Sequence, residues 1–196
     1  MELHLAGKRA LITGSSSGLG EGIARVLAAE GAAVVVHGDV TRDDEVTRVF
    51  EKATNFLGSI DILVNNAGVG FDVRGWDDLE PHEWTSMWET NVVSAVRFTR
   101  LALAGTRITV NAITPGAVMT PGFEKAVRAL ATQFGWGEDW DQIVHRVITE
   151  LLPNPTGRLG TILDVGNLVA FLASPLAGYI NGADVRIDGG SSSSFM

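Results

Sequence analysis

Three glycines and three serines lie close together near the start of the chain, in the segment Thr13-Gly14-Ser15-Ser16-Ser17-Gly18-Leu19-Gly20. Backbone N–H groups at the start of a helix bind phosphate oxygens, and glycine lets a phosphate approach the bare backbone. Gly14 suits a tight exit from a strand, Gly18 leaves space for a pyrophosphate, and Gly20 allows close helix packing. The spacing predicts a dinucleotide cradle, whose candidate binding residues are Gly14, Ser16, Ser17, Gly18, Leu19 and Gly20.

Two other interpretations of this segment lead to different chemistry. A flexible Gly/Ser turn would bind nothing, but strand and helix patterns flank the segment, as a phosphate cradle requires. The letters also match the nucleophile elbow of serine hydrolases, with Ser16 as the nucleophile. That fold needs an upstream strand and loop for its oxyanion hole, and only 13 residues precede Gly14, so we disfavour it.

The elements that must position this turn alternate along the chain. Apolar periodicity predicts strands over 9–13, 32–37, 60–65, 107–113 and 183–187, and helices over 18–30, 41–58, 83–104, 139–151 and 164–173. Thr41 is the expected N-cap of the second helix. Consecutive β-branched residues in the second strand indicate burial on both faces, as in a parallel sheet. We expect one domain over 1–196, a doubly wound, Rossmann-like α/β fold in three layers, α/β/α.

Composition argues against several classes of partner. The net charge is −8 and the pI is about 4.9, so the protein would repel nucleic acid. No run approaches the roughly 18 apolar residues of a membrane span, so we expect no membrane partner. Cysteine is absent and the four histidines lack metal-ligand spacing. We therefore expect no metal, and a cytoplasmic protein.

Further motifs follow the glycine segment in a fixed order. They are Asp39-Val40, Asn65-Asn66-Ala67-Gly68, Asn91 on the long helix, NAITPGAVMT over 111–120 and IDGG over 187–190. With this set the chain resembles, almost end to end, the short-chain dehydrogenases/reductases, and among them the 3-oxoacyl-carrier-protein reductases. The resemblance implies an oxidoreductase that uses NADP or NAD to interconvert carbonyl compounds and alcohols.

The resemblance also implies roles for the motif residues. Beyond the glycine segment, the cofactor residues would be Asp39 and Val40 at the adenine ring, Asn66, Ala67 and Gly68 beneath the adenosine ribose, and Pro115, Gly116, Val118 and Thr120 beside the nicotinamide. Asn91 matches a catalytic asparagine that holds a water in a proton relay. Family members whose second strand ends in His-Gly, as here at His37-Gly38, often continue with arginine, which favours NADP over NAD.

The family's acid–base residues are missing from this sequence. The family uses a serine and a Tyr-x-x-x-Lys pair, but the one tyrosine here, Tyr179, has no such lysine and is expected to pack structurally. Only 24 positions separate Asn91 from Pro115, whereas another strand and helix with their loops would need about 30 more residues. The missing residues would fall within 101–106. A helix and a strand of the family's pattern are also missing at a second place, over 37–39.

Three explanations of these gaps remain open. The protein contains two stretches that the sequence in hand omits, or it has truly lost them, or it is an intact but catalytically silent relative. We favour the first, because loss of a central strand would expose both neighbouring edges and remove core on two faces. A non-catalytic dinucleotide-binding or regulatory module is the alternative function.

Two segments bear on substrate and assembly. Residues 117–155 are expected to form a substrate lid, and its aromatic residues would suit an apolar carbonyl or alcohol substrate. These aromatics are also explained by packing of the lid helix onto the body. The long helix carries Trp84, Trp88, Val92 and Phe98 on one stripe, a natural interface for the homotetramer or dimer that the resemblance implies.

The first prediction concerns the covalent chain. We expect the purified protein to have an intact mass clearly above the 20.8 kDa of the printed sequence. Electrospray mass spectrometry measures this directly. A mass near 20.8 kDa would show that the two stretches are truly absent.

Overall fold

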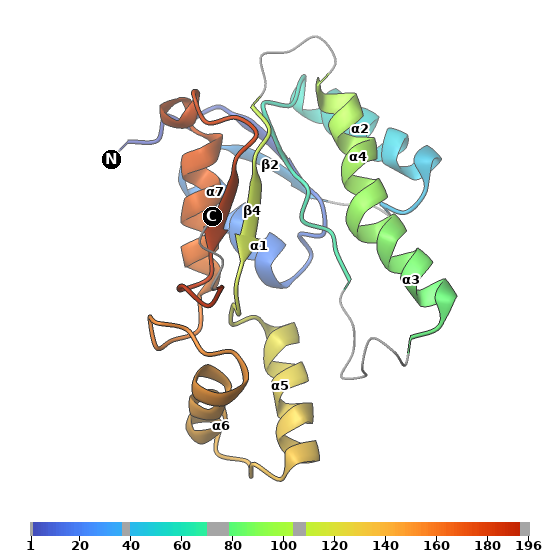
Figure 1. The fold of residues 1–196 in the computed structure, drawn as a ribbon. Coiled ribbons are helices and arrows are strands. Elements are labelled where there is room, and N and C mark those ends of the chain that lie inside the picture. The colour runs from blue at the N-terminus through green and yellow to red at the C-terminus, as the bar shows by residue number, and fades with distance from the viewer. Residues whose placement is uncertain (1, 37–39, 70–78, 104–108, 193–196) are drawn as a thin grey trace.

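The computed structural model describes residues 2–36, 40–69, 79–103 and 109–192 (Figure 1). Its strands are β1 (Arg9–Ile12), β2 (Ala33–Val36), β3 (Ile62–Val64), β4 (Ala112–Pro115) and β5 (Asp184–Ile187). Its helices are α1 (Gly18–Ala29), α2 (Asp43–Leu57), α3 (Pro81–Trp88), α4 (Ser94–Leu103), α5 (Pro121–Phe134), α6 (Trp140–Arg146) and α7 (Ile162–Ala173), with π-helical turns η2 (Glu89–Val93) and η3 (Val147–Leu151) and the 3-10 turn η4 (Pro175–Ala177).

The strands form two parallel sheets instead of the single sheet that the sequence suggests. Within the described residues, one sheet has the order β2-β1-β3 and the other contains β4 and β5. Pairing is parallel throughout, from Arg9 opposite Ala33 in the first sheet to Pro115 opposite Ile187 in the second. The doubly wound α/β class is therefore confirmed, but the sheet is divided between β3 and β4.

Helices lie on both sides of the first sheet and form three layers with it (Figure 1). On one side, α1 and α7 pack together over a buried cluster that includes Ile12, Leu27 and Val169. On the other side, α2 and α4 enclose a second cluster that includes Leu11 and Phe98. Because β1 contributes side chains to both clusters, its burial on two faces follows from its central position in the first sheet.

A charged pair fixes the register between β1 and β3. The guanidinium of Arg9 donates two hydrogen bonds to the carboxylate of Asp61, at 2.7 and 2.9 Å, and the Arg9 backbone N–H donates a third. These bonds hold the pKa of Asp61 below its usual value. The pair ties the starts of the two strands together, so their carboxyl ends meet where the glycine turn begins.

Two element boundaries differ from the sequence prediction. The N-cap of α2 is Arg42, not Thr41, and the helix begins directly with the acidic residues Asp43 and Asp44, whose charges favour a helix N-terminus. The fourth strand was predicted to begin at 107, but in the structure it begins at Ala112. Residues 107 and 108 lie outside the described residues. Ahead of Ala112, the N–H of Val110 donates to a side-chain oxygen and not to β5.

The long predicted helix is present as α3, η2 and α4, but its apolar stripe does not face the core. Of the stripe residues, only Phe98 is fully buried, whereas Trp88 is 61% exposed and Trp84 and Val92 are also exposed. The positions that face inward with Phe98 are Thr90 and Ser94. The indole and valine side chains therefore form an apolar surface, which we call the α3–α4 stripe.

One face of the β4–β5 sheet has no helix over it among the described residues. Ile113 and Ile187 turn toward α7 and join its cluster. The residues that alternate with them, Ala112, Thr114 and Asp184, are exposed. A parallel sheet is normally covered on both faces, so this sheet lacks part of one layer.

The expected lid is a helical unit with a small core of its own. Val127 of α5 and Ile143 of α6 are buried against each other's helices, and Phe123, Trp136 and Trp140 pack around this core. Phe134 stacks on Trp136 with ring centres 5.5 Å apart. The aromatic residues thus join α5 to α6, which agrees with a packing role within the lid more than with a substrate-facing role.

The second prediction tests the packing of α4 with a matched pair of phenylalanines. Phe98 is 0% exposed and Phe56, on α2, is 81% exposed. Phe98→Ala should lower the free energy of unfolding by about 3–5 kcal/mol, because it leaves a cavity. Phe56→Ala should change it by no more than about 0.5 kcal/mol. Urea unfolding followed by circular dichroism measures both, and equal effects would contradict the burial of Phe98.

Candidate dinucleotide-binding site

The glycine segment forms the turn between β1 and α1, as the sequence predicts. Gly14 and Gly18 have φ angles of +65° and +60°, which favour glycine. A Cβ at Gly14 would lie 2.6 Å from the Cα of Ala67, whereas a Cβ at Gly18 would meet nothing closer than Thr120, at 4.0 Å. Gly14 therefore permits a close backbone contact, and Gly18 leaves open space at the N-terminus of α1.

Gly20 and the serines have different roles from one another. A Cβ at Gly20 would collide with the side chain of Asn66, so Gly20 packs against the turn itself. Ser15 is buried and its hydroxyl donates to the carbonyl of Ile12 at 2.8 Å. Ser16 and Ser17 are exposed, and Ser17 precedes the first residue of α1. The hydroxyls of Ser16 and Ser17 and the first N–H groups of α1 are available to an anion at this end of the helix.

Thr13 and Asn66 lock the turn to the end of β3. The Thr13 hydroxyl oxygen accepts the backbone N–H groups of Asn66 and Ala67, each at 3.0 Å. In return, the amide nitrogen of the Asn66 side chain donates to the carbonyls of Thr13 and Gly14, at 3.1 and 3.0 Å. Four hydrogen bonds thus hold the glycine turn and the 66–68 segment as one unit, as expected for neighbouring parts of a cofactor site.

Asn91 lies in the π-helical turn η2 and clamps the segment that follows Gly68. Its side-chain oxygen accepts the N–H of Val69 and its side-chain nitrogen donates to the carbonyl of Val69, both at 2.8 Å. A single π-helical turn within an α-helix often marks a functional site. In this structure the side-chain amide of Asn91 binds the backbone of Val69. Its role in a proton relay remains a prediction.

The predicted nicotinamide loop lies beside the glycine turn. Pro115 ends β4, and a Cβ at Gly116 would lie 2.8 Å from the Cα of Asp188, so only glycine fits there. Val118 is buried, and Thr120 is the N-cap of α5, its hydroxyl accepting the N–H of Phe123 at 3.1 Å. A Cβ built at Gly18 would lie 4.0 Å from the Cβ of Thr120, so the two predicted segments are neighbours.

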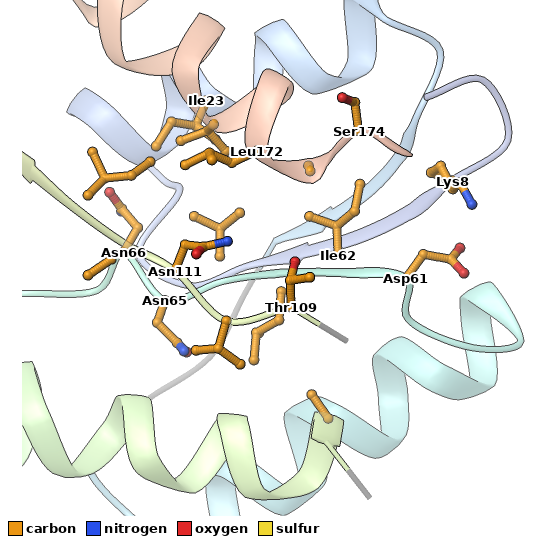
Figure 2. Close-up of a pocket in the computed structure, with 18 of the residues that line it drawn as sticks. Lys8, Ile23, Asp61, Ile62, Asn65, Asn66, Thr109, Asn111, Leu172 and Ser174 are labelled. Carbon is orange, nitrogen blue, oxygen red and sulfur yellow. The ribbon is translucent and has the colours of Figure 1, made fainter. Parts of the chain in front are cut away.

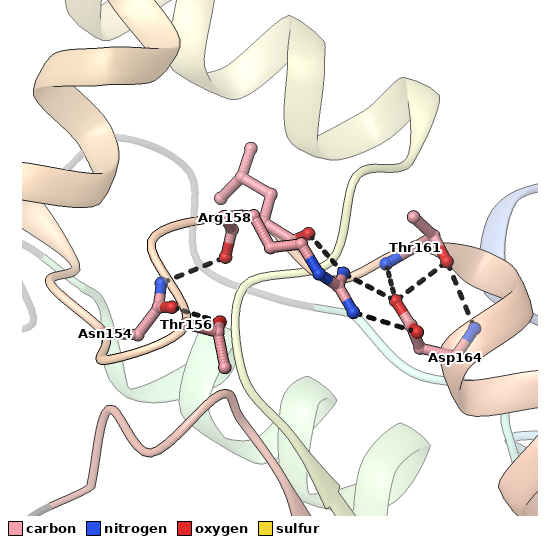
Figure 3. Close-up of polar contacts among 6 residues, drawn as sticks. Asn154, Thr156, Arg158, Thr161 and Asp164 are labelled. Atoms are coloured by element: carbon pink, nitrogen blue, oxygen red, sulfur yellow. Dashed lines mark hydrogen bonds and ion pairs between the residues drawn. The ribbon is translucent and has the colours of Figure 1, made fainter.

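A polar network of Arg158, Thr161 and Asp164 lies next to Gly160, which contacts this loop (Figure 3). Arg158 donates two hydrogen bonds to Asp164, at 2.8 and 3.1 Å, and Asp164 also accepts the N–H of Thr161 at 2.7 Å. The Arg158 guanidinium, followed by Thr161, holds the pKa of Asp164 well below its usual range. The network fixes Gly160, whose N–H and carbonyl bond to the loop over 117–119, each at 2.8 Å.

Sequence reasoning missed two residues that shape the site and misplaced one. Thr13 was treated only as the start of the motif, although its position directly after β1 places its hydroxyl beside the next strand. Arg97 binds Glu89 at 3.0 Å and also Asp43 and the carbonyl of Thr41, which fixes the chain beside Val40. Tyr179 is fully exposed, so the prediction that it packs structurally is wrong.

The adenine end of the site is only partly described. Val40 is buried against Leu11 and Phe98, whereas Asp39 lies outside the described residues. The residues that are described fit a dinucleotide, because the open space over Gly18 adjoins a free helix N-terminus. No group of three or more metal-ligating side chains occurs within the described ranges, and no described helix has the length and apolarity to cross a membrane.

Comparison with known families agrees with this geometry. A family model described as "Enoyl-(Acyl carrier protein) reductase" matches residues 3–107 and 101–192. The two matched segments meet at 101–107, at the junction where the spacing indicates missing residues. The match therefore covers nearly the whole chain, but in two pieces.

Several curated relatives share about the same level of identity. An uncharacterized oxidoreductase of Bacillus subtilis is 30% identical over 264 aligned positions, covering 97% of this chain and 98% of its own. D-beta-hydroxybutyrate dehydrogenase of Cupriavidus necator is 30% identical over 95% of this chain and 98% of its own. A 3-oxoacyl-[acyl-carrier-protein] reductase of Vibrio cholerae is 29% identical over 96% and 98%. The 264 positions exceed the 196 residues here, so at least 68 positions have no counterpart in this chain.

Solved structures show the same fold. L-sorbose reductase of Gluconobacter frateurii, complexed with NADPH and L-sorbose, has a TM-score of 0.90 and 26% identity, covering 100% of both chains. Aldohexose dehydrogenase of Thermoplasma acidophilum has a TM-score of 0.84 at 22% identity, covering 100% of this chain and 99% of its own. The named relatives and structures are all oxidoreductases, so the comparisons give no support to the alternative of a non-catalytic module.

The third prediction tests the lock between the turn and β3. Thr13→Val keeps the side-chain shape but leaves the N–H groups of Asn66 and Ala67 without their acceptor. We expect a loss of about 2–4 kcal/mol in the free energy of unfolding. Thr47→Val, on the exposed side of α2, is the matched control and should cost no more than about 0.5 kcal/mol. Equal losses in urea unfolding would show that the hydrogen bonds to the Thr13 hydroxyl contribute nothing to the free energy of unfolding.

Proposed function

Because the chain belongs to the short-chain dehydrogenase/reductase family of NAD(P)-dependent oxidoreductases, we propose that it interconverts a small carbonyl compound and the corresponding secondary alcohol. When bound, the nicotinamide cofactor supplies or accepts the hydride. One observation carries the proposal: Gly18 leaves open space at the N-terminus of α1, directly beside Thr120. A dinucleotide phosphate at that helix end would meet N–H donors and the positive end of the helix dipole.

This chain's own residues would bind and orient the cofactor. Gly14, Ser16, Ser17, Gly18, Leu19 and Gly20 would hold the diphosphate, Val40 with Asp39 the adenine, Asn66, Ala67 and Gly68 the ribose, and Pro115, Gly116, Val118 and Thr120 the nicotinamide side. The hydrogen bonds of Thr13 and Asn66 keep the glycine turn and the 66–68 segment together. These parts are formed before any ligand binds, which lowers the ordering cost of binding.

Proton transfer is where this chain departs from its family. It has a single tyrosine, which lies exposed near the start of β5, and no Tyr-x-x-x-Lys sequence. A positioned acid or base contributes roughly 10²–10⁴-fold to such reactions. We therefore expect a protein of the printed 196 residues to turn over more slowly, by about that factor, than an enzyme with the complete set.

We also propose NADPH as the preferred cofactor and a homo-oligomer as the working state. The sequence His37-Gly38 after β2 and the NADPH bound to L-sorbose reductase support the cofactor choice. The α3–α4 stripe supports self-association, because Trp84, Trp88, Val92 and Val96 are exposed at four-residue spacing on one helix face. A dimer or tetramer would bury these side chains.

The fourth prediction tests cofactor binding at Gly18 with a matched glycine. Gly18→Ala and Gly7→Ala both place alanine at a positive φ with no close contact, so both should lower stability by about 1 kcal/mol. Only the Gly18 variant puts a methyl group in the proposed phosphate space. We expect NADPH affinity to fall at least tenfold for Gly18→Ala and to stay unchanged for Gly7→Ala, in a fluorescence titration repeated with NADH.

Turnover is measured in the same preparation, from NADPH absorbance with a panel of ketones and ketoses. Slow oxidation of NADPH by at least one of these compounds is expected. Unchanged affinity of the Gly18 variant would refute the cradle. Binding without turnover of any carbonyl would refute the enzymatic proposal while leaving the binding site intact.

A further inference from the structure

The predicted nicotinamide loop follows β4, and among the described strands β4 does not pair with the first sheet. A cavity of about 600 Å³ lies between β3 and β4 (Figure 2). The loop bonds instead to the segment over 156–161, which connects the lid to α7. The position of the loop therefore depends in part on how this connecting segment is held.

Three consecutive residues of the connecting segment contact three different parts of the molecule. Arg158 binds Asp164 near the start of α7. Leu159 is buried in the hydrophobic core of the lid, and Gly160 makes two backbone hydrogen bonds of 2.8 Å to the nicotinamide loop. A displacement of Arg158 would thus reach the lid and the loop together.

The contact with α7 is an ion pair of defined direction. The Arg158 guanidinium donates to both carboxylate oxygens of Asp164, at 2.8 and 3.1 Å. The N–H and the hydroxyl of Thr161 donate to the same carboxylate, at 2.7 and 2.8 Å. An arginine that binds both oxygens of a carboxylate is fixed in direction as well as in distance. Because the guanidinium keeps the pKa of Asp164 well below its usual range, the pair stays charged at neutral pH.

The other polar contacts of the connecting segment join neutral groups. The N–H of Thr156 donates to the carbonyl of Gly189 at 3.3 Å, and the side chain of Asn154 donates to the carbonyl of Arg158 at 3.1 Å. Hydrogen bonds that involve charged groups are roughly twice as strong as neutral ones. Arg158 therefore makes the strongest polar contact that holds this segment to the body.

We propose that Arg158 is a positioning residue for the nicotinamide half of the cofactor. It holds Gly160 against the loop and so keeps Val118 and Thr120 where the nicotinamide would lie. The glycine turn and the 66–68 segment hold the other half of the cofactor without it. The inference rests on the proposed function, and it predicts that Arg158 acts on a bound dinucleotide through the nicotinamide end alone.

Two ligands that differ only in the nicotinamide ring test this inference on the full-length protein. They are NADPH and 2′-phospho-ADP-ribose. Arg158→Met keeps most of the side-chain length but removes its donors. In isothermal titration calorimetry we expect the affinity for NADPH to fall about fivefold, as for a partly exposed ion pair, and the affinity for 2′-phospho-ADP-ribose to change by less than about twofold.

Arg48 offers a matched control, because it pairs with Glu45 on α2 and its side chain is 59% exposed, against 56% for Arg158. Arg48→Met should change neither affinity. Arg158→Lys restores one charged donor and should recover part of the NADPH affinity. Asp164→Asn keeps an oxygen for Thr161 but weakens the ion pair, so adding it to Arg158→Met should cause little further loss.

A second readout needs no cofactor. The N–H of Met119 donates to Gly160, whereas the N–H of Trp136 donates to Ala131 within the lid. In Arg158→Met, amide hydrogen exchange measured by NMR should become faster at Met119 by about fivefold or more, and it should stay unchanged at Trp136.

Equal losses of affinity for the two ligands would overturn the inference, because they would show a purely structural role. Unchanged NADPH affinity in Arg158→Met would overturn it as well. If the wild-type protein binds neither ligand, the proposed function fails. Faster exchange at Met119 in Arg158→Met would then still support the positioning of the loop, and unchanged exchange would overturn it.

Discussion

A strand inside a parallel α/β sheet needs a hydrogen-bonding partner on each side, and among the described residues of this protein β3 and β4 have one partner each. Much of what is unusual about the molecule follows from this constraint. The sheet is divided in two, a cavity runs along the division, and one face of β4 and β5 is uncovered. The described body is held across the division mainly by α1 and α7, which share one hydrophobic cluster with strands of both sheets.

The dinucleotide cradle remains intact because its contacts are made on one side of the division. The glycine turn, Thr13 and the 66–68 segment all belong to the first sheet, where β1 and β3 are directly paired. The nicotinamide loop belongs to the second sheet, yet it meets the cradle through Thr120 and is fixed by Arg158, Asp164 and Gly160. The proposed cofactor site and the proton-transfer residues are thus separate questions in this chain, because the printed sequence lacks a Tyr-x-x-x-Lys pair but retains the glycine turn.

The sequence predicted the parts of the fold that depend on local pattern. Glycine spacing, the strand before it and the helix after it located the turn between β1 and α1, because a tight turn and a helix N-terminus are local features. The arrangement of the two sheets was only partly predictable. Spacing shows that residues are missing between them, but it does not show where the edges of β3 and β4 lie relative to each other. The α3–α4 stripe was predicted as an interface between copies of the chain, and that stays a prediction, because periodicity identifies an apolar face without saying what covers it.

The most direct test of the divided sheet is amide hydrogen exchange at four backbone positions, measured by NMR on the protein alone. The amides of Thr13 and Ala112 donate to neighbouring strands and should be protected. In a protein of the printed 196 residues, the amides of Leu63 and Ile113 face the cavity between β3 and β4 and should exchange at least tenfold faster, although Ile113 adjoins Ala112 on the same strand. Protection of Leu63 and Ile113 equal to that of their neighbours would show that β3 and β4 are paired in solution, and would contradict this account.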